Sequence, residues 1–365
     1  MILMNDFKAE PEELVQRQLA AVERVLRSGW YILGKEVKDF EAAWANCCGV
    51  AEAVGVANGM DAIEIGLRTL GIGAGDEVIT TPMTAFATVL AIFRVGAQPV
   101  LADIDADTAL SSMDSVARCI SSKTKAVLLV HMYGQLSDMA KWQEFCRLQG
   151  ILLLEDCAQA HLAQWSGNVA GSFGAYGAYS FYPTKNLGAI GDAGALVTND
   201  FELAERARVI RNYGQSERYH HPELGLNSRL DELHAAMLTE RLKWLDSFTV
   251  RRREVAEAYH ANVKNPAITM LALPLQSKSH VYHLFVVRCE ERDRLSKYLT
   301  AAGVANLAHY PIPAHQQRPC AEVRVDPNGL PAVEAHAKTC LSIPCHPQMT
   351  DDDVAKVVEV VNAFK

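Results

Sequence analysis

The sequence predicts an α/β protein built on a mostly parallel sheet. Short apolar runs alternate with helix-length segments, which is the pattern of βαβ units. The runs lie at residues 54–57, 75–82, 100–104, 126–131 and 151–154. Polar residues stand where several runs end, and ligands of such sheets bind at strand ends. We expect a large domain over residues 1–245, with an N-terminal arm, and a small α+β domain over residues 246–365.

The composition bounds the class of protein. The 365 residues are 49% hydrophobic and 21% charged, as in an ordinary globular enzyme. A net charge of −8 without a long Lys/Arg run argues against a nucleic-acid partner. We expect a cytoplasmic protein with no membrane partner, because neither an apolar leader nor a run of transmembrane length is present. The nine cysteines form no CxxC pair, which predicts buried thiols and no metal site.

The turn after residues 54–57 is a candidate phosphate site. Asn58 leads there into Gly59, Met60 and Asp61, and a helix is predicted to follow. The start of a helix presents free backbone N–H groups to an anion. The alternative is a simple helix cap by Asn58 or Asp61, because the segment has neither a GxGxxG nor a Walker A pattern.

The stretch over residues 151–199 places an acid and a lysine at strand ends. The run 151–154 stops at Glu155 and Asp156, and the run 178–182 leads to Lys185. A lysine in apolar surroundings has a lowered pKa and can form a Schiff base with an aldehyde. A buried aspartate can keep a pyridine nitrogen protonated. The pair predicts a pyridoxal-phosphate site, although an isolated pair would more simply be a turn cap and an exposed lysine.

The remaining segments are predicted from hydrophobic periodicity. Tyr31 follows the first helix and lies between two glycines, where an aromatic ring either packs in the core or lines a pocket. The loop 216–224 is polar and aromatic and contains Arg218 and Tyr219. Helices are expected at 12–28, 84–93, 203–211, 251–260, 291–302 and 351–364, a strand at 283–288 and an extended piece at 304–311.

Six motifs in order resemble the DegT/StrS-type sugar-nucleotide aminotransferases, over roughly residues 5–360. They are GVANGMDAIEIGLRTLGIGAGDEVI, LVHMYGQ, EDCAQAH, SFYPTKNLGAIGDAGALVTND, RNYGQ and GLNSRLDE. The resemblance implies an aspartate-aminotransferase-like (fold type I) large domain with three α/β/α layers, and pyridoxal 5'-phosphate as cofactor. The segments SGWYILGKE and HYPIPAHQQ look closest to the dTDP-3-amino-3,6-dideoxyhexose transaminases, which act on 3-keto sugars.

The resemblance also assigns the cofactor residues. Lys185 would be the catalytic Schiff-base lysine and Asp156 the catalytic partner of the pyridine nitrogen, with Gln159 against the ring. Phe86 is the candidate for stacking on the ring, although it comes one residue after the family's aromatic position, which is Ala85 here. The alternative is that smaller side chains cover the ring. The phosphate would be held by the backbone of Met60 and Asp61, by the Ser180 hydroxyl, and by Asn227 from the other subunit of an obligate homodimer.

Substrate residues are implied in the same way. Tyr182 and His309 would approach the sugar, Arg218 and Tyr219 from the neighbouring subunit would face the nucleotide phosphates, and Tyr31 is a further candidate. For His309 the alternative is a packed loop histidine.

The implied reaction is ping-pong transamination from L-glutamate to a nucleotide-linked keto-sugar, best matched by a dTDP-3-keto-6-deoxyhexose. Lys185 would shuttle protons as general acid and base. The pathway would be glycan, lipopolysaccharide or antibiotic-sugar biosynthesis. Two alternatives stay open: amination at C4 of a 4-keto sugar, and a non-catalytic regulatory homologue that binds the cofactor. Lys185 argues against a dehydratase, because dehydratases of this family carry histidine at that position.

Overall fold

The computed structural model describes residues 1–365 and confirms the α/β class. The main sheet consists of β1 (Glu52–Val56), β2 (Glu77–Thr80), β3 (Gln98–Leu101), β4 (Thr124–Val130), β5 (Leu152–Asp156), β8 (Gly177–Ser180), β9 (Gly194–Thr198) and β12 (Arg324–Val325). Its strand order is β1-β9-β8-β5-β4-β2-β3-β12. Only β9 runs against the others, because it is antiparallel to both β1 and β8 while the remaining pairs are parallel.

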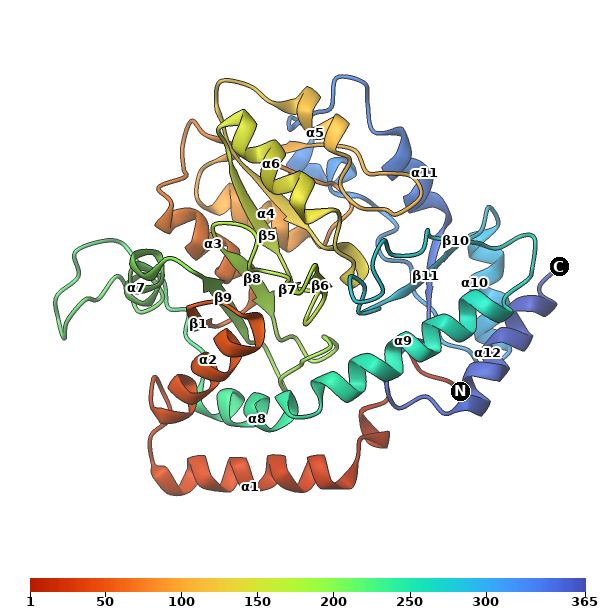
Figure 1. Cartoon of the computed structure of the whole chain (residues 1–365), viewed down its shortest axis with the longest axis horizontal. Helices are drawn as coiled ribbons and strands as arrows, with labels where there is room; N and C mark the ends of the chain where they lie inside the picture. Colours follow the sequence, from red (N-terminus) through yellow and green to blue (C-terminus); the bar gives the residue numbers. More distant parts are fainter.

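Helices cover both faces of this sheet, which gives the three layers that the resemblance implied (Figure 1). They are α1 (Glu12–Ser28), α2 (Lys35–Cys48), α3 (Gly59–Thr69), α4 (Phe86–Arg94), α5 (Met113–Cys119), α6 (Met139–Gln149), α7 (Phe201–Ile210) and α8 (Glu232–Leu242). One buried cluster joins the sheet to α2, α5, α6 and α8, and another joins it to α3, α4 and α7. Along β1, Ala53 belongs to the first cluster and Val54 to the second, as strand alternation requires.

The C-terminal part forms a smaller α+β unit, as expected. Its antiparallel sheet consists of β10 (Thr269–Met270), β11 (Phe285–Arg288) and β13 (Cys340–Ile343), and its helices are α9 (Leu245–Asn262), α10 (Arg292–Ala301), α11 (Pro331–Thr339) and α12 (Asp351–Ala363). A separate buried cluster lies between these elements. The extended piece predicted at 304–311 belongs to no sheet and makes two isolated bridges, from Val304 to Ile2 and from Leu307 to Ser342.

Two contacts tie the ends of the chain together. The C-terminal strand β12 pairs with β3 at the edge of the main sheet, and Ile2 of the N-terminal arm forms a bridge with Val304. The two parts therefore share backbone hydrogen bonds, and the domain boundary at residue 245 stays a prediction. No helix combines the length and the apolar composition needed to span a bilayer.

Candidate active site

Most of the predicted cofactor residues gather at the carboxyl ends of the parallel strands. β5 ends at Asp156, β8 ends at Ser180, and α3 begins directly after β1. Ser180 lies so close to Gly59 that a Cβ placed on this glycine would be 2.7 Å from the Ser180 Cβ. A larger residue at position 59 would push the start of α3 away from Ser180. Glycine is therefore required for the helix start and the serine hydroxyl to face the same space.

At the start of α3, one backbone N–H group is capped and two others are free to bind a ligand. Asn58 Oδ1 accepts a hydrogen bond from the Asp61 N–H at 2.8 Å, so the capping interpretation is confirmed for Asn58. The predicted phosphate contact of the Asp61 N–H is therefore wrong for this structure, because that donor is already used by the cap. The N–H groups of Gly59 and Met60 have no acceptor within the helix. Ser180 Oγ accepts from the Tyr182 N–H at 3.3 Å, which leaves the serine proton available. An anion at this point would meet two backbone donors, one hydroxyl and the positive end of the α3 dipole.

The Asp156 carboxylate is buried and held from two sides. Its side chain accepts a hydrogen bond from Thr88 Oγ1 at 2.7 Å and one from the Ala158 N–H at 3.1 Å. Thr84 Oγ1 lies 2.7 Å from Thr88 Oγ1. Because these donors favour the charged form of a carboxyl group, they offset the cost of burying it. The site therefore contains an oriented negative charge.

Lys185 is the positive counterpart of this charge. Its backbone N–H donates to the Tyr182 carbonyl at 2.8 Å, which fixes the turn after β8. The side chain is half-buried, and its removal from water lowers the lysine pKa to about 8 even though the Asp156 charge acts in the opposite direction. Nζ forms no ion pair with any carboxylate. The amine is therefore poised to lose a proton near neutral pH.

Gln159 is fixed by two tyrosines. Its Oε1 accepts from the Tyr133 N–H at 2.7 Å, and its Nε2 lies 3.4 Å from the Tyr310 hydroxyl, to which it donates. Burial, together with the Asp156 charge, raises the pKa of Tyr310 to about 12, so this group remains a neutral hydroxyl. The Tyr133 hydroxyl donates to the backbone carbonyl of His309. These hydrogen bonds hold residues 309–310 beside Gln159 and Tyr133.

Two neutral histidines lie in the surroundings of Lys185. His309 Nδ1 is 2.8 Å from Ser342 Oγ, and His283 Nδ1 is 3.1 Å from Asn186 Oδ1. Burial, followed by the Lys185 charge, lowers the pKa of His309 to about 4, and the same causes place the pKa of His283 well below its usual value. Both rings can exchange hydrogen bonds with a polar ligand without adding charge.

The DegT/DnrJ/EryC1/StrS aminotransferase family matches residues 12–362. The chain belongs to this family. It is 45% identical over 344 residues to the dTDP-3-amino-3,6-dideoxy-alpha-D-galactopyranose transaminase of Aneurinibacillus thermoaerophilus, with 94% of each chain covered. It is 39% identical to a protein of Geobacillus stearothermophilus named pleiotropic regulatory protein, with 99% of this chain and 98% of that one covered.

A solved structure extends this relationship to three dimensions. DesV of S. venezuelae, in complex with a ketimine intermediate, matches this chain with a TM-score of 0.95 at 42% identity. The match covers 99% of this chain and 97% of DesV. The protein is therefore an aminotransferase, and the predicted fold class is confirmed.

Phe86, the candidate for ring stacking, packs elsewhere in this structure. Its ring contacts the cluster of Val89, Leu101, Ala314 and Cys320 at the edge of the main sheet. On a helix, residues two positions apart point roughly 200° from one another, so Phe86 lies away from the α4 face that presents Thr88 to Asp156. The packing gives the stacking assignment no support, and it stays a prediction.

The candidate substrate residues differ in where they lie. Tyr182 is close to Lys185 in the same turn, whereas Tyr219 is 81% exposed and Arg218 stacks on it with 5.0 Å between the guanidinium carbon and the ring centre. Asn227 and Tyr31 are also exposed. The loop after α7 extends away from the ends of β5 and β8 (Figure 1). Within one chain it is separate from the strand-end site.

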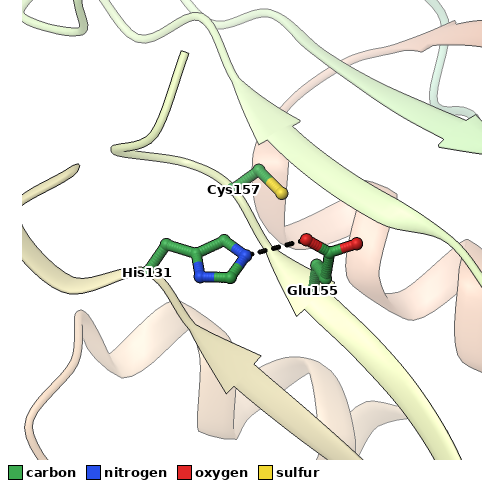
Figure 2. Close-up of side chains that lie close together, drawn as sticks. All are labelled: His131, Glu155 and Cys157. Carbon is green, nitrogen blue, oxygen red and sulfur yellow. Dashed lines mark hydrogen bonds and ion pairs between the residues drawn. The ribbon is translucent and has the colours of Figure 1, made fainter. Parts of the chain in front are cut away.

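Beside Asp156 lies a buried cluster of His131, Glu155 and Cys157, the kinds of side chain that can bind a metal (Figure 2). Glu155, however, already accepts hydrogen bonds from His131 Nε2 at 2.9 Å and from three backbone N–H groups at 2.8 Å, those of Gly171, Phe173 and Gly174. Burial beside two carboxylates also places the Cys157 pKa well above its usual value, which disfavours a thiolate ligand. We interpret the cluster as a fastening of the 171–174 loop to β5.

Several residues of the site were missed by sequence reasoning. Thr88, Tyr133, Tyr310, Asn186 and His283 all contact a predicted site residue or lie beside one. Weak signals existed: Thr84 and Thr88 are four residues apart in the otherwise apolar segment 84–93, and His283 directly precedes an apolar run.

Proposed function

We propose that the protein uses pyridoxal 5'-phosphate to transfer an amino group from L-glutamate to a nucleotide-linked keto-sugar. The observation that carries this proposal is the half-buried Lys185, with a pKa lowered to about 8, beside an Asp156 carboxylate held by two donors. These are the two groups needed to bind an aldehyde and to keep a pyridine nitrogen protonated.

The chain offers a partner for each end of this cofactor. Its phosphate would be bound by the Gly59 and Met60 N–H groups and the Ser180 hydroxyl, its ring nitrogen by Asp156, and its phenolic side by Gln159. The close approach of Gly59 to Ser180, which a Cβ would prevent, supports this fit. Bound there, the cofactor would supply an aldehyde and a ring that stores an electron pair.

Lys185 would move the protons. With a pKa of about 8, about a tenth of the amine is neutral at pH 7, enough to act as a base while the rest can act as an acid. The amine would take a proton from the amino donor and return one to the sugar carbon that receives nitrogen. Asp156 would hold the ring-nitrogen proton throughout. His283 and His309, both neutral, would orient sugar hydroxyls without competing for the charge of Lys185.

We further propose that two chains complete each site. Asn227, Arg218 and Tyr219 are exposed and lie on or next to the loop that extends from the body of the molecule. A guanidinium is well suited to bind a pyrophosphate bidentately, and an exposed asparagine can reach a phosphate of a neighbouring chain. In this arrangement, Arg218 and Tyr219 bind the nucleotide and Asn227 binds the cofactor phosphate of the other subunit.

The favoured acceptor is a dTDP-3-keto-6-deoxyhexose, because the relative with 45% identity is named for a 3-amino-3,6-dideoxy sugar product. Amination at C4 is the alternative substrate choice. A regulatory role without catalysis is the second candidate, because the relative with 39% identity carries a regulatory name. The intact Lys185 and Asp156 favour the enzyme.

The test is a product analysis. Purified protein loaded with pyridoxal 5'-phosphate is incubated with L-glutamate and, separately, with dTDP-linked 3-keto- and 4-keto-6-deoxyhexoses, and the amino position is read by NMR. We expect an amine at C3 and 2-oxoglutarate in equal amount. An amine found only at C4 would replace the favoured substrate. A protein that binds the cofactor but exchanges no amino group with glutamate would support the regulatory role instead.

A further inference from the structure

A row of buried hydroxyls lies behind Asp156. Thr88 on α4 is 1% exposed and its Oγ1 is 2.7 Å from Asp156 Oδ2. Thr84, 5% exposed, lies just before the helix and its Oγ1 is 2.7 Å from Thr88 Oγ1. The only other donor to the carboxylate is the Ala158 N–H. Half of the hydrogen bonding that holds Asp156 therefore comes from α4, an element far from it in sequence.

The hydrogen bonds among Thr84, Thr88 and Asp156 can run in only one direction when the carboxylate is ionised. An ionised carboxylate only accepts hydrogen bonds, so the single hydroxyl proton of Thr88 must point to Asp156. In the contact between the two threonines, Thr84 must then be the donor. The order Thr84 to Thr88 to Asp156 makes each donor polarise the next one. It also fixes the orientation of the Asp156 carboxylate.

We propose that Thr88, supported by Thr84, is a positioning residue that holds the Asp156 carboxylate in place for the ring nitrogen of the cofactor. This inference rests on the proposed function. Without the Thr88 hydrogen bond, the carboxylate is held less firmly in position and stabilises the protonated ring nitrogen less. The ring then carries less positive charge and withdraws less electron density from the nitrogen that joins Lys185 to the cofactor. That nitrogen becomes more basic, and the cofactor is bound more weakly.

The experiment compares four variants of the full-length protein. Thr88→Val keeps the shape and removes the hydroxyl, Thr88→Ser keeps the hydroxyl, and Thr84→Val removes only the second donor. Thr249→Val is the matched control, because Thr249 is 3% exposed in α9 and its hydroxyl has no partner. Two quantities are measured: the affinity of the apoprotein for pyridoxal 5'-phosphate, and the pH midpoint at which the visible absorbance of the loaded protein changes.

Thr88→Val is expected to weaken cofactor binding about tenfold and to raise the pH midpoint by about one unit, the size expected for one hydrogen bond to a charged group. Thr84→Val should shift both quantities in the same direction by a smaller amount. Thr88→Ser and Thr249→Val should match the wild type. If Thr88 acted only through packing, Thr88→Ser would have no reason to keep the wild-type pH midpoint.

The proposal is overturned if Thr88→Val and Thr249→Val give the same midpoint, or if Thr88→Ser behaves like Thr88→Val. Should Thr88→Val not fold, Thr84→Val decides, and an unchanged midpoint there refutes the ordered row. A wild-type protein that binds no pyridoxal 5'-phosphate contradicts the proposed function itself. If the wild type binds pyridoxal 5'-phosphate normally and the threonine variants change neither the affinity nor the pH midpoint, only the proposed role of Thr84 and Thr88 is contradicted.

Discussion

The strand-end site and the loop after α7 are built in opposite ways. At the strand ends, Asp156, Gln159 and Ser180 are each fixed by hydrogen bonds to a separate element of the same chain. On the loop, the Arg218 guanidinium lies over the Tyr219 ring, and Tyr219 is 81% exposed. In the first region the catalytic side chains are fixed within one chain, whereas the second has residues suited to a ligand but no surface of its own to hold one.

The difference separates two tasks. A group that must hold a proton at a defined atom needs a fixed position, which buried hydrogen bonds provide. A group that recognises a solvated nucleotide benefits from a long, mobile side chain on an exposed loop. The ligand or a second subunit can then fix its conformation. We therefore expect substitutions at the strand ends to reduce turnover and stability, and substitutions on the loop to reduce substrate affinity alone.

The largest effect is expected from Lys185→Ala. Without its amine the site has no proton carrier, so turnover should fall by more than about a thousandfold. The visible absorbance of the lysine-bound cofactor should disappear. Lys297→Ala, an exposed lysine on α10 without an ion pair, is the control and should be unchanged. Both readouts come from one purified preparation, and retained turnover in Lys185→Ala would sink the proposed mechanism.

A strong effect on stability is expected from Glu155→Gln. The substitution removes one acceptor oxygen and turns an N–H₂ group toward backbone donors of the 171–174 loop, which lie 2.8 Å from the carboxylate in the native chain. We expect a loss of about 3 kcal/mol in the free energy of unfolding, measured by urea denaturation. Glu144→Gln, on the exposed side of α6, is the control. Equal stability of the two variants would show that the cluster does not fasten the loop.

On the loop, Arg218→Ala should act on affinity. We expect KM for the sugar nucleotide to rise about tenfold, the value of one charge-assisted contact, with kcat and the melting temperature unchanged. Arg294→Ala on α10 provides the matched control for loss of an exposed arginine. An unchanged KM would remove Arg218 from the nucleotide site. A fall in stability would contradict the contrast between the two regions.

Much of the strand-end site could be predicted because its chemistry is local in sequence. Asp156 and Ser180 end apolar runs short enough to be buried strands, and strands running in parallel bring their ends together. The helix start at Gly59 could also be predicted from the sequence, whereas the contact of Gly59 with Ser180 could not. The six motifs supplied the family and with it the cofactor.

The rest depended on packing between segments distant in sequence. Thr88 reaches Asp156 across 68 positions, and nothing in its own helix marks it as more than a buried threonine. The backbone strain at Leu162 is likewise visible only in the structure. Its φ of 63° lies in the left-handed region that favours glycine. The orientation of Phe86 likewise follows from the edge strand β12, which the sequence did not reveal.

The last expected effect is a pH dependence of the apoprotein. The pKa of Lys185 is lowered from 10.5 to about 8 on folding, so the unfolded chain binds more protons than the folded one between these values. Stability contributed by this group therefore rises with pH from about 8 to 10.5 and is constant below. The slope is at most about 1.4 kcal/mol per pH unit. Urea denaturation of the wild type and of Lys185→Met at pH 7.5 and 9.5 measures this contribution. Between these pH values, the wild type should gain stability relative to the variant. An equal pH dependence of the two proteins would show that Lys185 is as well solvated in the folded protein as in the unfolded chain.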